Sequence, residues 1–148
     1  MAVSPDGKSV YVASFESGAV ARLNRRRSSG AITQPAGSAG CVSETGAGPC
    51  ADGHGLDNAN AVAVSPDGKS VYVASFYSNA VVRLKRMKGS GVIKQPKKAG
   101  CVSETGAGPC ADGHGLKRVR SVGVSGDGKS VYAASIASDA VARFNRAP

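Results

Sequence analysis

The sequence predicts an all-β fold made of repeated antiparallel sheets, and three observations support this prediction. The stretch at residues 3–15 returns at 64–76 and, slightly changed, at 124–136, so the 148-residue chain is repetitive. Twenty Gly and seven Pro divide it into short segments, none with the long apolar period of an amphipathic helix. Within segments such as 70–76, successive side chains alternate between two chemically consistent faces, as in a β-strand.

Each repeat opens with a predicted β-hairpin, whose arms in the middle copy are residues 60–65 and 70–76. Pro66 presets φ for a turn, Asp67 can accept a hydrogen bond from its own backbone, and Gly68 can adopt positive φ. A calcium site is not expected, because each turn offers one Asp followed by Lys whereas calcium needs several converging oxygens. The predicted turn-forming residues are Pro5, Asp6, Gly7, Pro66, Asp67, Gly68, Asp127 and Gly128.

Two further strands complete the repeat, at residues 80–86 and 91–95. Four short antiparallel strands followed by a longer connection are the unit of a β-propeller blade. The first strand of the first copy keeps only residues 2–4, and the third copy stops after its third strand, which gives about 2.75 blades and an incomplete ring. The predicted organisation is a single repeat domain, 1–148, divided into blade 1 (about 1–35), a disulfide loop (36–57), blade 2 (about 58–96), a second disulfide loop (97–117) and blade 3 without its outer strand (about 118–148).

The hairpin sequence Val64-Ser-Pro-Asp-Gly-Lys-Ser-Val-Tyr-Val-Ala-Ser75 resembles bacterial β-propeller repeats of the lactonase-like and YVTN kind. In that family it joins the innermost strand of a blade to the second strand. The resemblance covers all three copies, over roughly the first half of each period. It implies the propeller fold, but it says little about activity, because such propellers include sugar lactonases, surface-layer proteins and members with no assigned reaction.

Three blades cannot close a ring, since propellers usually contain about four to eight blades. Blade faces rich in Val and Ala would therefore stay open at both ends of the stack, and exposed apolar surface of this extent normally marks an interface. We expect self-association or further blades to close the ring. Two copies facing each other would supply six blades.

The loop between blades is the best preserved part of the repeat, because residues 41–56 recur letter for letter at 101–116. An even cysteine count with identical internal spacing favours one local disulfide in each loop. Such bonds imply an oxidising compartment, so an extracellular or cell-surface location is predicted. The alternative is a zinc site, but the spacing matches no common zinc pattern, and neither a metal nor a cofactor is predicted. The predicted disulfide cysteines are Cys41, Cys50, Cys101 and Cys110, and the alternative zinc ligands are Cys41, Cys50 and His54 with Asp52 or Glu44.

Ser43, Glu44 and His54 supply the residue types of a nucleophile, a base and an orienting group. They occur twice in identical form, however, whereas an active site normally draws different residues from different blades. The identity of the two copies therefore favours a structural role or a repeated binding surface, and no catalytic residue is predicted.

The chain is basic, with 19 Lys and Arg against 10 Asp and Glu and a formal charge of +9. This charge attracts polyanions, and anionic polysaccharide is a candidate partner. Nucleic acid is an unfavoured partner, because the basic stretches lack stacking aromatic residues apart from Phe144. Membrane insertion is not expected, since no run of about 18 apolar residues occurs. The candidate polyanion contacts are Arg25, Arg26, Arg27, Lys85, Arg86, Lys88, Lys97 and Lys98.

Two classes of function follow. The first is a non-catalytic propeller module with a binding or structural role outside the cell. The second, which the resemblance permits, is a lactonase-like hydrolase acting on a sugar lactone once the ring is complete. A hydrolase should place polar, distinct residues at the channel end of each blade, yet the inner strands at 61–64 and 121–124 consist of small and mostly apolar residues. The sequence therefore favours the first class.

Overall fold

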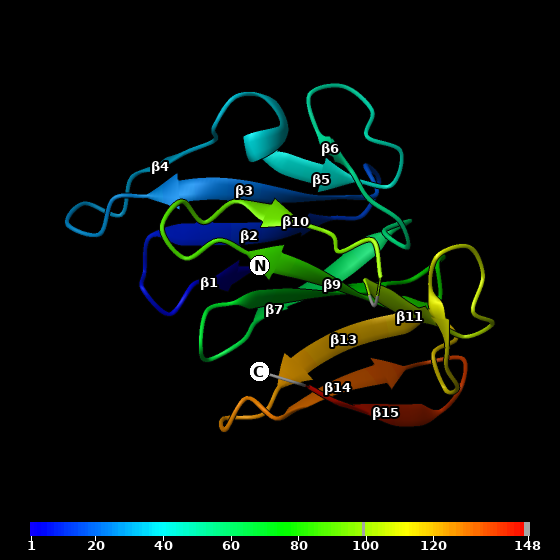
Figure 1. Cartoon of the computed structure of the whole chain (residues 1–148). Coiled ribbons are helices and arrows are strands. Elements are labelled where there is room, and N and C mark those ends of the chain that lie inside the picture. The colour runs from blue at the N-terminus through cyan, green and yellow to red at the C-terminus, as the bar shows by residue number, and fades with distance from the viewer. Residues whose placement is uncertain (99, 147–148) are drawn as a thin grey trace.

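The computed structural model describes residues 1–98 and 100–146, and within them it is all-β apart from the 3-10 turn η1 (Gly37–Ala39). Three sheets follow one another in chain order and are stacked side by side, as Figure 1 shows. Each sheet pairs its first three strands antiparallel to one another, in the order of the chain. The predicted class of propeller blades in an incomplete ring is confirmed.

The blades are named here by their strands. Blade 1 contains β1 (Ala2–Val3), β2 (Ser9–Ser14), β3 (Ala19–Arg25), β4 (Ile32–Thr33), β5 (Cys41–Ser43) and β6 (Ala51–Asp52). Blade 2 contains β7 (Ala59–Val64), β8 (Ser70–Ser75), β9 (Ala80–Arg86), β10 (Ile93–Lys94), β11 (Cys101–Ser103) and β12 (Ala111–Asp112). Blade 3 contains β13 (Val119–Val124), β14 (Ser130–Ser135) and β15 (Ala140–Asn145). The last two residues of the predicted blade 3, at 147–148, and residue 99 of the predicted second loop lie outside the described residues.

The turns between the first two strands of each blade have the chemistry that the sequence predicts. The Gly68 N–H donates to the Ser65 carbonyl at 2.8 Å, and Gly68 has φ +68°, a conformation that favours glycine. One carboxylate oxygen of Asp67 accepts hydrogen bonds from the Ser65 hydroxyl at 2.6 Å and from the Lys69 N–H at 3.0 Å. The same contacts recur in blades 1 and 3, so the turn is a unit of the repeat.

The outer strand of a blade differs from the prediction, because it is assembled from two pieces. The predicted strand at 91–95 shortens to β10, which pairs with the end of β9. The other half of β9 pairs with β11, where Cys101 lies opposite Val82. Pro96 follows β10 and has no N–H to donate, so the chain leaves the sheet there and returns at Cys101. The cysteine-rich loops therefore supply part of each outer strand.

Two apolar clusters hold the stack together, one at each junction between blades. The cluster between blades 1 and 2 includes Tyr11, Val20, Val42, Leu56, Val71, Val73, Val82, Leu84 and Ile93. The cluster between blades 2 and 3 includes Tyr72, Ala74, Val81, Leu116, Val119, Val122, Val131 and Ala133. Blade 2 thus buries one face against blade 1 and the other face against blade 3.

Candidate functional site

The inner strands of blades 2 and 3 each carry an irregularity at the end where the strand begins. The pairing of β7 with β8 shifts between Ala59 and Ala61, and the pairing of β13 with β14 shifts between Val119 and Ser121. The extra residue is Asn60 in one bulge and Arg120 in the other. Bulges redirect side chains and are frequent beside active sites. The Asn60 side-chain amide donates to the Arg120 carbonyl at 2.9 Å, which links the two inner strands.

Two arginines share one aromatic ring beside these bulges. The guanidinium carbons of Arg118 and Arg120 lie 5.6 Å and 5.0 Å from the centre of the Phe76 ring. Arg118 has φ 55° and is held by its backbone N–H, which donates to the Asn79 side chain at 2.7 Å. Cation–π contact with one ring keeps two exposed cations close together. We call Asn60, Phe76, Arg118 and Arg120 the inner-strand cluster, and its two guanidinium groups can bind an anion through bidentate hydrogen bonds.

The glutamates of the cysteine-rich loops accept hydrogen bonds from backbone N–H groups of the same loops. The Glu44 carboxylate accepts a hydrogen bond from the Leu56 N–H, and the Glu104 carboxylate accepts one from the Leu116 N–H at 2.6 Å. Ser43 is buried, and its hydroxyl has no hydrogen-bond partner among the described residues. His54 has an exposed side chain, so the structure does not assemble Ser43, Glu44 and His54 into a catalytic group.

The cysteines of each loop are joined locally, Cys41 to Cys50 and Cys101 to Cys110, with Cα atoms 4.7 Å apart in both pairs. These cysteines are not available as zinc ligands, and no cluster of three metal-ligating side chains occurs within residues 1–98 and 100–146. The first loop also docks on blade 2, since Gln95 accepts from the His54 N–H at 2.6 Å and donates to the His54 carbonyl at 2.9 Å. Two disulfides fit an oxidising, non-cytoplasmic compartment.

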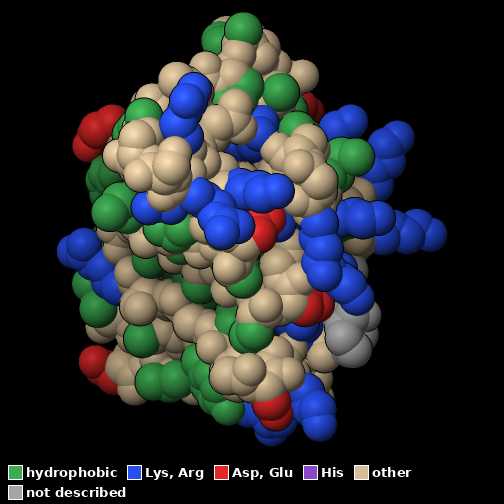
Figure 2. Space-filling view, turned by 90° about the vertical axis from the view of Figure 1, so that its left-hand side faces the viewer, with side chains coloured by type: hydrophobic (Ala, Val, Ile, Leu, Met, Phe, Trp, Pro, Cys, Tyr) green, Lys and Arg blue, Asp and Glu red, His purple; other side chains and the backbone are tan. Residues whose placement is uncertain are grey.

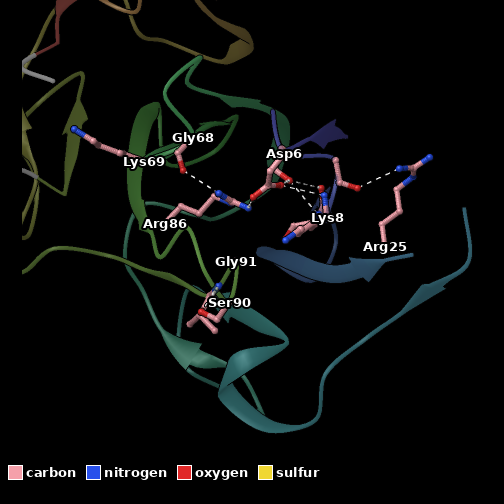
Figure 3. A network of polar contacts seen from close by, with 12 residues as sticks. Asp6, Lys8, Arg25, Gly68, Lys69, Arg86, Ser90 and Gly91 are labelled. Carbon is pink, nitrogen blue, oxygen red and sulfur yellow. Dashed lines mark hydrogen bonds and ion pairs between the residues drawn. The ribbon is translucent and has the colours of Figure 1, made fainter. Parts of the chain in front are cut away.

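A network of polar groups joins blade 1 to blade 2 at the end of the stack that carries the repeated turns (Figure 3). Arg86 donates through Nη2 to Asp6 at 2.8 Å, through Nη1 to the Gly68 carbonyl at 3.1 Å and through Nε to the Tyr11 hydroxyl at 2.7 Å. The Tyr11 hydroxyl in turn donates to the Gly91 carbonyl at 2.6 Å. Every one of these groups except Asp6 is buried, so the network is a cross-blade clamp rather than a surface ion pair.

The junction between blades 2 and 3 repeats the ion pair with a different geometry. Arg146 donates to both carboxylate oxygens of Asp67, at 2.9 Å and 2.7 Å, and to the Gly128 carbonyl at 2.9 Å. Burial of Asp67 disfavours its charge, but hydrogen bonds from Arg146 and Ser65 outweigh it and hold the pKa of Asp67 well below its usual range. The pKa of Asp6 is lowered in the same way, against its burial, by hydrogen bonds from Ser4 and Arg86.

The interpretation of Arg86 as a polyanion contact is therefore wrong, because its side chain is 1% exposed and bound to Asp6. Arg25, its counterpart in blade 1, is half-buried and donates to the Gly7 carbonyl at 3.1 Å. Figure 2 views the side that is at the left in Figure 1, and it shows Lys and Arg side chains gathered there with a few Asp and Glu between them. The exposed members of the predicted set are Arg26, Arg27, Lys85, Lys88, Lys97 and Lys98.

The cross-blade Arg–Asp pairs were missed by the sequence reading, although a signal for them exists. Arg25, Arg86 and Arg146 recur at the same place in the repeat, as do the turn aspartates. An ion-pair partner that lies 79 or 80 residues away, in the neighbouring repeat, is not visible in any local motif.

A hollow of about 300 Å³ lies between the outer parts of blades 2 and 3. Its walls include Tyr72, Val102, Val131 and Phe144, which are apolar along most of their length. At the junction between blades 1 and 2, the corresponding cluster contains the buried Ile93 of β10.

Comparison with solved structures agrees with this architecture. A protein from Lactobacillus plantarum matches with a TM-score of 0.70 at 22% identity over 98% of this chain. A candidate 6-phosphogluconolactonase from Bacteroides uniformis matches with a TM-score of 0.67 at 20% identity over 99% of the chain. The periplasmic gluconolactonase PpgL of Pseudomonas aeruginosa matches with a TM-score of 0.64 at 18% identity over 97% of the chain.

The fold is that of a propeller segment. At these identities the likeness concerns the fold alone, and the chain spans only 36%, 35% and 37% of the three matched chains. No protein-family model and no curated protein sequence matches this chain. Among the described residues there is no helix with the length and apolar character needed to cross a membrane.

Proposed function

We propose that the chain contributes to a lactonase-like hydrolase that acts on a sugar lactone bearing an acidic group. Arg118 and Arg120 would bind that group. The observation that carries this proposal is the placement of both guanidinium groups over one Phe76 ring at the start of an inner strand.

Three features support the proposal. The bulges place Asn60 and Arg120 at equivalent positions of blades 2 and 3, so the inner strands of neighbouring blades begin with chemically different groups. The expectation of only small, apolar residues at this end was based on 61–64 and 121–124, and it left out the bulged residues. Two matched structures are a candidate 6-phosphogluconolactonase and a gluconolactonase. The phosphate of a phosphorylated lactone offers pairs of oxygens to the planar guanidinium of arginine, which binds them through two parallel hydrogen bonds.

The second candidate is a non-catalytic module that binds an anionic ligand, such as an acidic polysaccharide, at the same arginines. It is favoured by the first cysteine-rich loop, where Ser43 is buried and the His54 side chain is exposed, so that the two are not assembled with Glu44 into a catalytic group. In this candidate the loops are supports and the inner-strand cluster is a binding site only.

The experiment compares two lactones with an oxidised sample, after subtraction of the spontaneous rate. We expect turnover of 6-phosphogluconolactone and weaker turnover of the unphosphorylated lactone. In the double variant Arg118→Gln/Arg120→Gln, KM for the phosphorylated lactone should rise about tenfold or more, as expected for loss of a charge-assisted contact. KM for the neutral lactone should change little.

The matched control is Arg26→Gln, which removes an exposed arginine that directly follows β3 and does not belong to the inner-strand cluster. It should leave both KM values unchanged. If neither lactone is consumed faster than in buffer, the hydrolase proposal is wrong. Calorimetric titration with an acidic oligosaccharide then tests the second candidate, which requires binding that the double variant abolishes.

A further inference from the structure

Both junctions in the chain are built from the same two kinds of surface. The forward face of a blade carries the turn aspartate and the tyrosine of its second strand, as with Asp6 and Tyr11. The rear face of the next blade carries the arginine that ends its third strand, as with Arg86. Because the blades follow one another in one direction, the forward face of blade 3 and the rear face of blade 1 meet no other blade within the described chain.

These two faces expose side chains that are buried elsewhere in the repeat. On the forward face of blade 3, Tyr132 is 42% exposed, whereas its counterparts Tyr11 and Tyr72 are 0% and 6% exposed. On the rear face of blade 1, Ile32 is 56% exposed, whereas Ile93 is 2% exposed. The same residue type at the same position is thus buried wherever a neighbouring blade covers it.

The polar groups of the two faces are already arranged as in a formed junction. Arg25 donates through Nη1 to the Gly7 carbonyl at 3.1 Å, just as Arg86 donates to the Gly68 carbonyl at 3.1 Å. Asp127 accepts from the Ser125 hydroxyl at 2.6 Å and from the Lys129 N–H at 3.0 Å through one oxygen. Its other oxygen, and Nη2 of Arg25, have no hydrogen-bond partner among residues 1–98 and 100–146.

We infer that the forward face of blade 3 docks on the rear face of blade 1 of a second copy of this chain. Asp127 then binds Arg25 of the other copy as Asp6 binds Arg86, and Tyr132 lies between Arg25 and Gly30 as Tyr11 lies between Arg86 and Gly91. The contact is head to tail, so two copies make it twice and close a ring of six blades. This number lies within the usual range of about four to eight.

A second copy fits these two open faces because each of them repeats a surface that is covered by a matching blade face elsewhere in the same chain. The charges also match, because Asp127 lies on one face and Arg25 on the other, as in the two ion pairs within the chain. The loops extend this match, because Gln34 occupies in blade 1 the place of Gln95, which binds the first loop at His54. The identical second loop presents the His114 backbone to Gln34 of the other copy.

The decisive experiment exploits the fact that each dimer contains two identical contacts. Arg25→Asp puts two carboxylates in each contact, and Asp127→Arg puts two guanidinium groups in each. We expect a dimer for the unaltered chain in native mass spectrometry and sedimentation velocity over about 1–50 μM, a range typical of standard protein interfaces. Each variant alone should be a folded monomer, because both side chains lie at faces that no other blade covers.

An equimolar mixture of the two variants should form a dimer again, since both contacts are then complementary. Arg26→Asp, which reverses an exposed neighbouring charge, should remain a dimer. Far-ultraviolet circular dichroism checks that each variant is folded, and Tyr132→Arg provides a second disruptive change that does not alter the ion pair. A monomeric unaltered chain over this range would overturn the inference, as would a mixture that stays monomeric.

Discussion

The two junctions between blades contain the same sequence motif, but they differ in hydrogen bonding and in packing. Between blades 1 and 2, Arg86 distributes its hydrogen bonds over Asp6, Tyr11 and the Gly68 carbonyl. Between blades 2 and 3, Arg146 binds Asp67 through both carboxylate oxygens, and its Nε has no partner among the described residues. The second junction also contains the hollow of about 300 Å³.

This difference between the junctions indicates that a junction depends on the outer strand as well as on the repeated hairpin. The Tyr11 hydroxyl donates to Gly91, which lies in the connection between β9 and β10. Ile93 of β10 is buried in the same cluster. The hairpin supplies the ion pair, while the outer strand completes the polar clamp and fills the space beside it.

The largest expected effect comes from removing the carboxylate of each ion pair. Asp67→Ala leaves Arg146, whose side chain is 4% exposed, with one hydrogen bond, to the Gly128 carbonyl. An unpaired buried charge is costly, so the free energy of unfolding should fall by about 3 kcal/mol. Asp6→Ala should cost about 2 kcal/mol, because Arg86 keeps both Tyr11 and Gly68. Urea unfolding at pH 7 measures both values.

Asp127→Ala is the matched control for this comparison. It removes the same hydrogen bonds within the turn, but it breaks no ion pair with an arginine of the same chain. When unfolding is measured at a protein concentration low enough to keep the copies apart, the loss of stability is the contribution of the turn alone. Equal losses for Asp6→Ala and Asp127→Ala would contradict an energetic role for the clamp.

The second largest loss of stability is expected from removing a disulfide. The two loops have identical sequences but different surroundings, so they can be compared directly. Replacing the cysteines of either loop by Ser should cost about 2.5 kcal/mol, as expected for a short closed loop. The first loop remains tied to blade 2 through Gln95, whereas no such contact to the second loop occurs among the described residues. Hydrogen exchange should therefore accelerate more at residues 111–116 after Cys101→Ser/Cys110→Ser than at 51–56 after Cys41→Ser/Cys50→Ser. Equal acceleration would show that the Gln95 contact does not order its loop.

A smaller effect separates the two buried tyrosines. Tyr11→Phe leaves the Arg86 Nε and the Gly91 carbonyl without their partner, so it should cost about 1.5 kcal/mol. Tyr72→Phe should cost about 0.5 kcal/mol or less, because the Arg146 Nε, the counterpart of the Arg86 Nε, has no hydrogen-bond partner among the described residues. Thermal or urea unfolding of the two variants provides the test, and a cost for Tyr72→Phe as large as that of Tyr11→Phe would remove the distinction.

The last effect is a dependence on pH that both junctions share. The pKa values of Asp6 and Asp67 are lowered in the folded protein, so folding favours their charged forms. This stability is fully present above the unfolded pKa of about 4, and it is lost as the pH falls toward the lowered folded values. Stability should therefore stay level from pH 7 to about 5 and decline below about 4. In Asp6→Asn/Asp67→Asn the decline should be shallower, and an unchanged slope would contradict the assignment.

Much of the blade was predictable, because its determinants are close together in the sequence. The turn at Pro66, Asp67 and Gly68 and the strand at 80–86 follow from residues that act on their own backbone or their neighbours. The outer strand was predicted with less success, since β11 pairs with β9 only after the chain has left the sheet at Pro96 and returned at Cys101. The inner-strand cluster was missed because a bulge depends on the pairing register, which no single strand specifies.

Alternation and turn chemistry act over a few residues, so the amino-acid sequence was enough to predict an all-β chain, a unit that repeats three times and the position of each hairpin turn. Contacts between blades were needed to show that Arg86 is a buried partner of Asp6 rather than a surface cation, and that Arg118 and Arg120 meet at one aromatic ring. The physical reason is that charge, burial and hydrogen bonding depend on what lies across a junction. In this chain the ion-pair partners lie 79 or 80 residues apart, in neighbouring repeats.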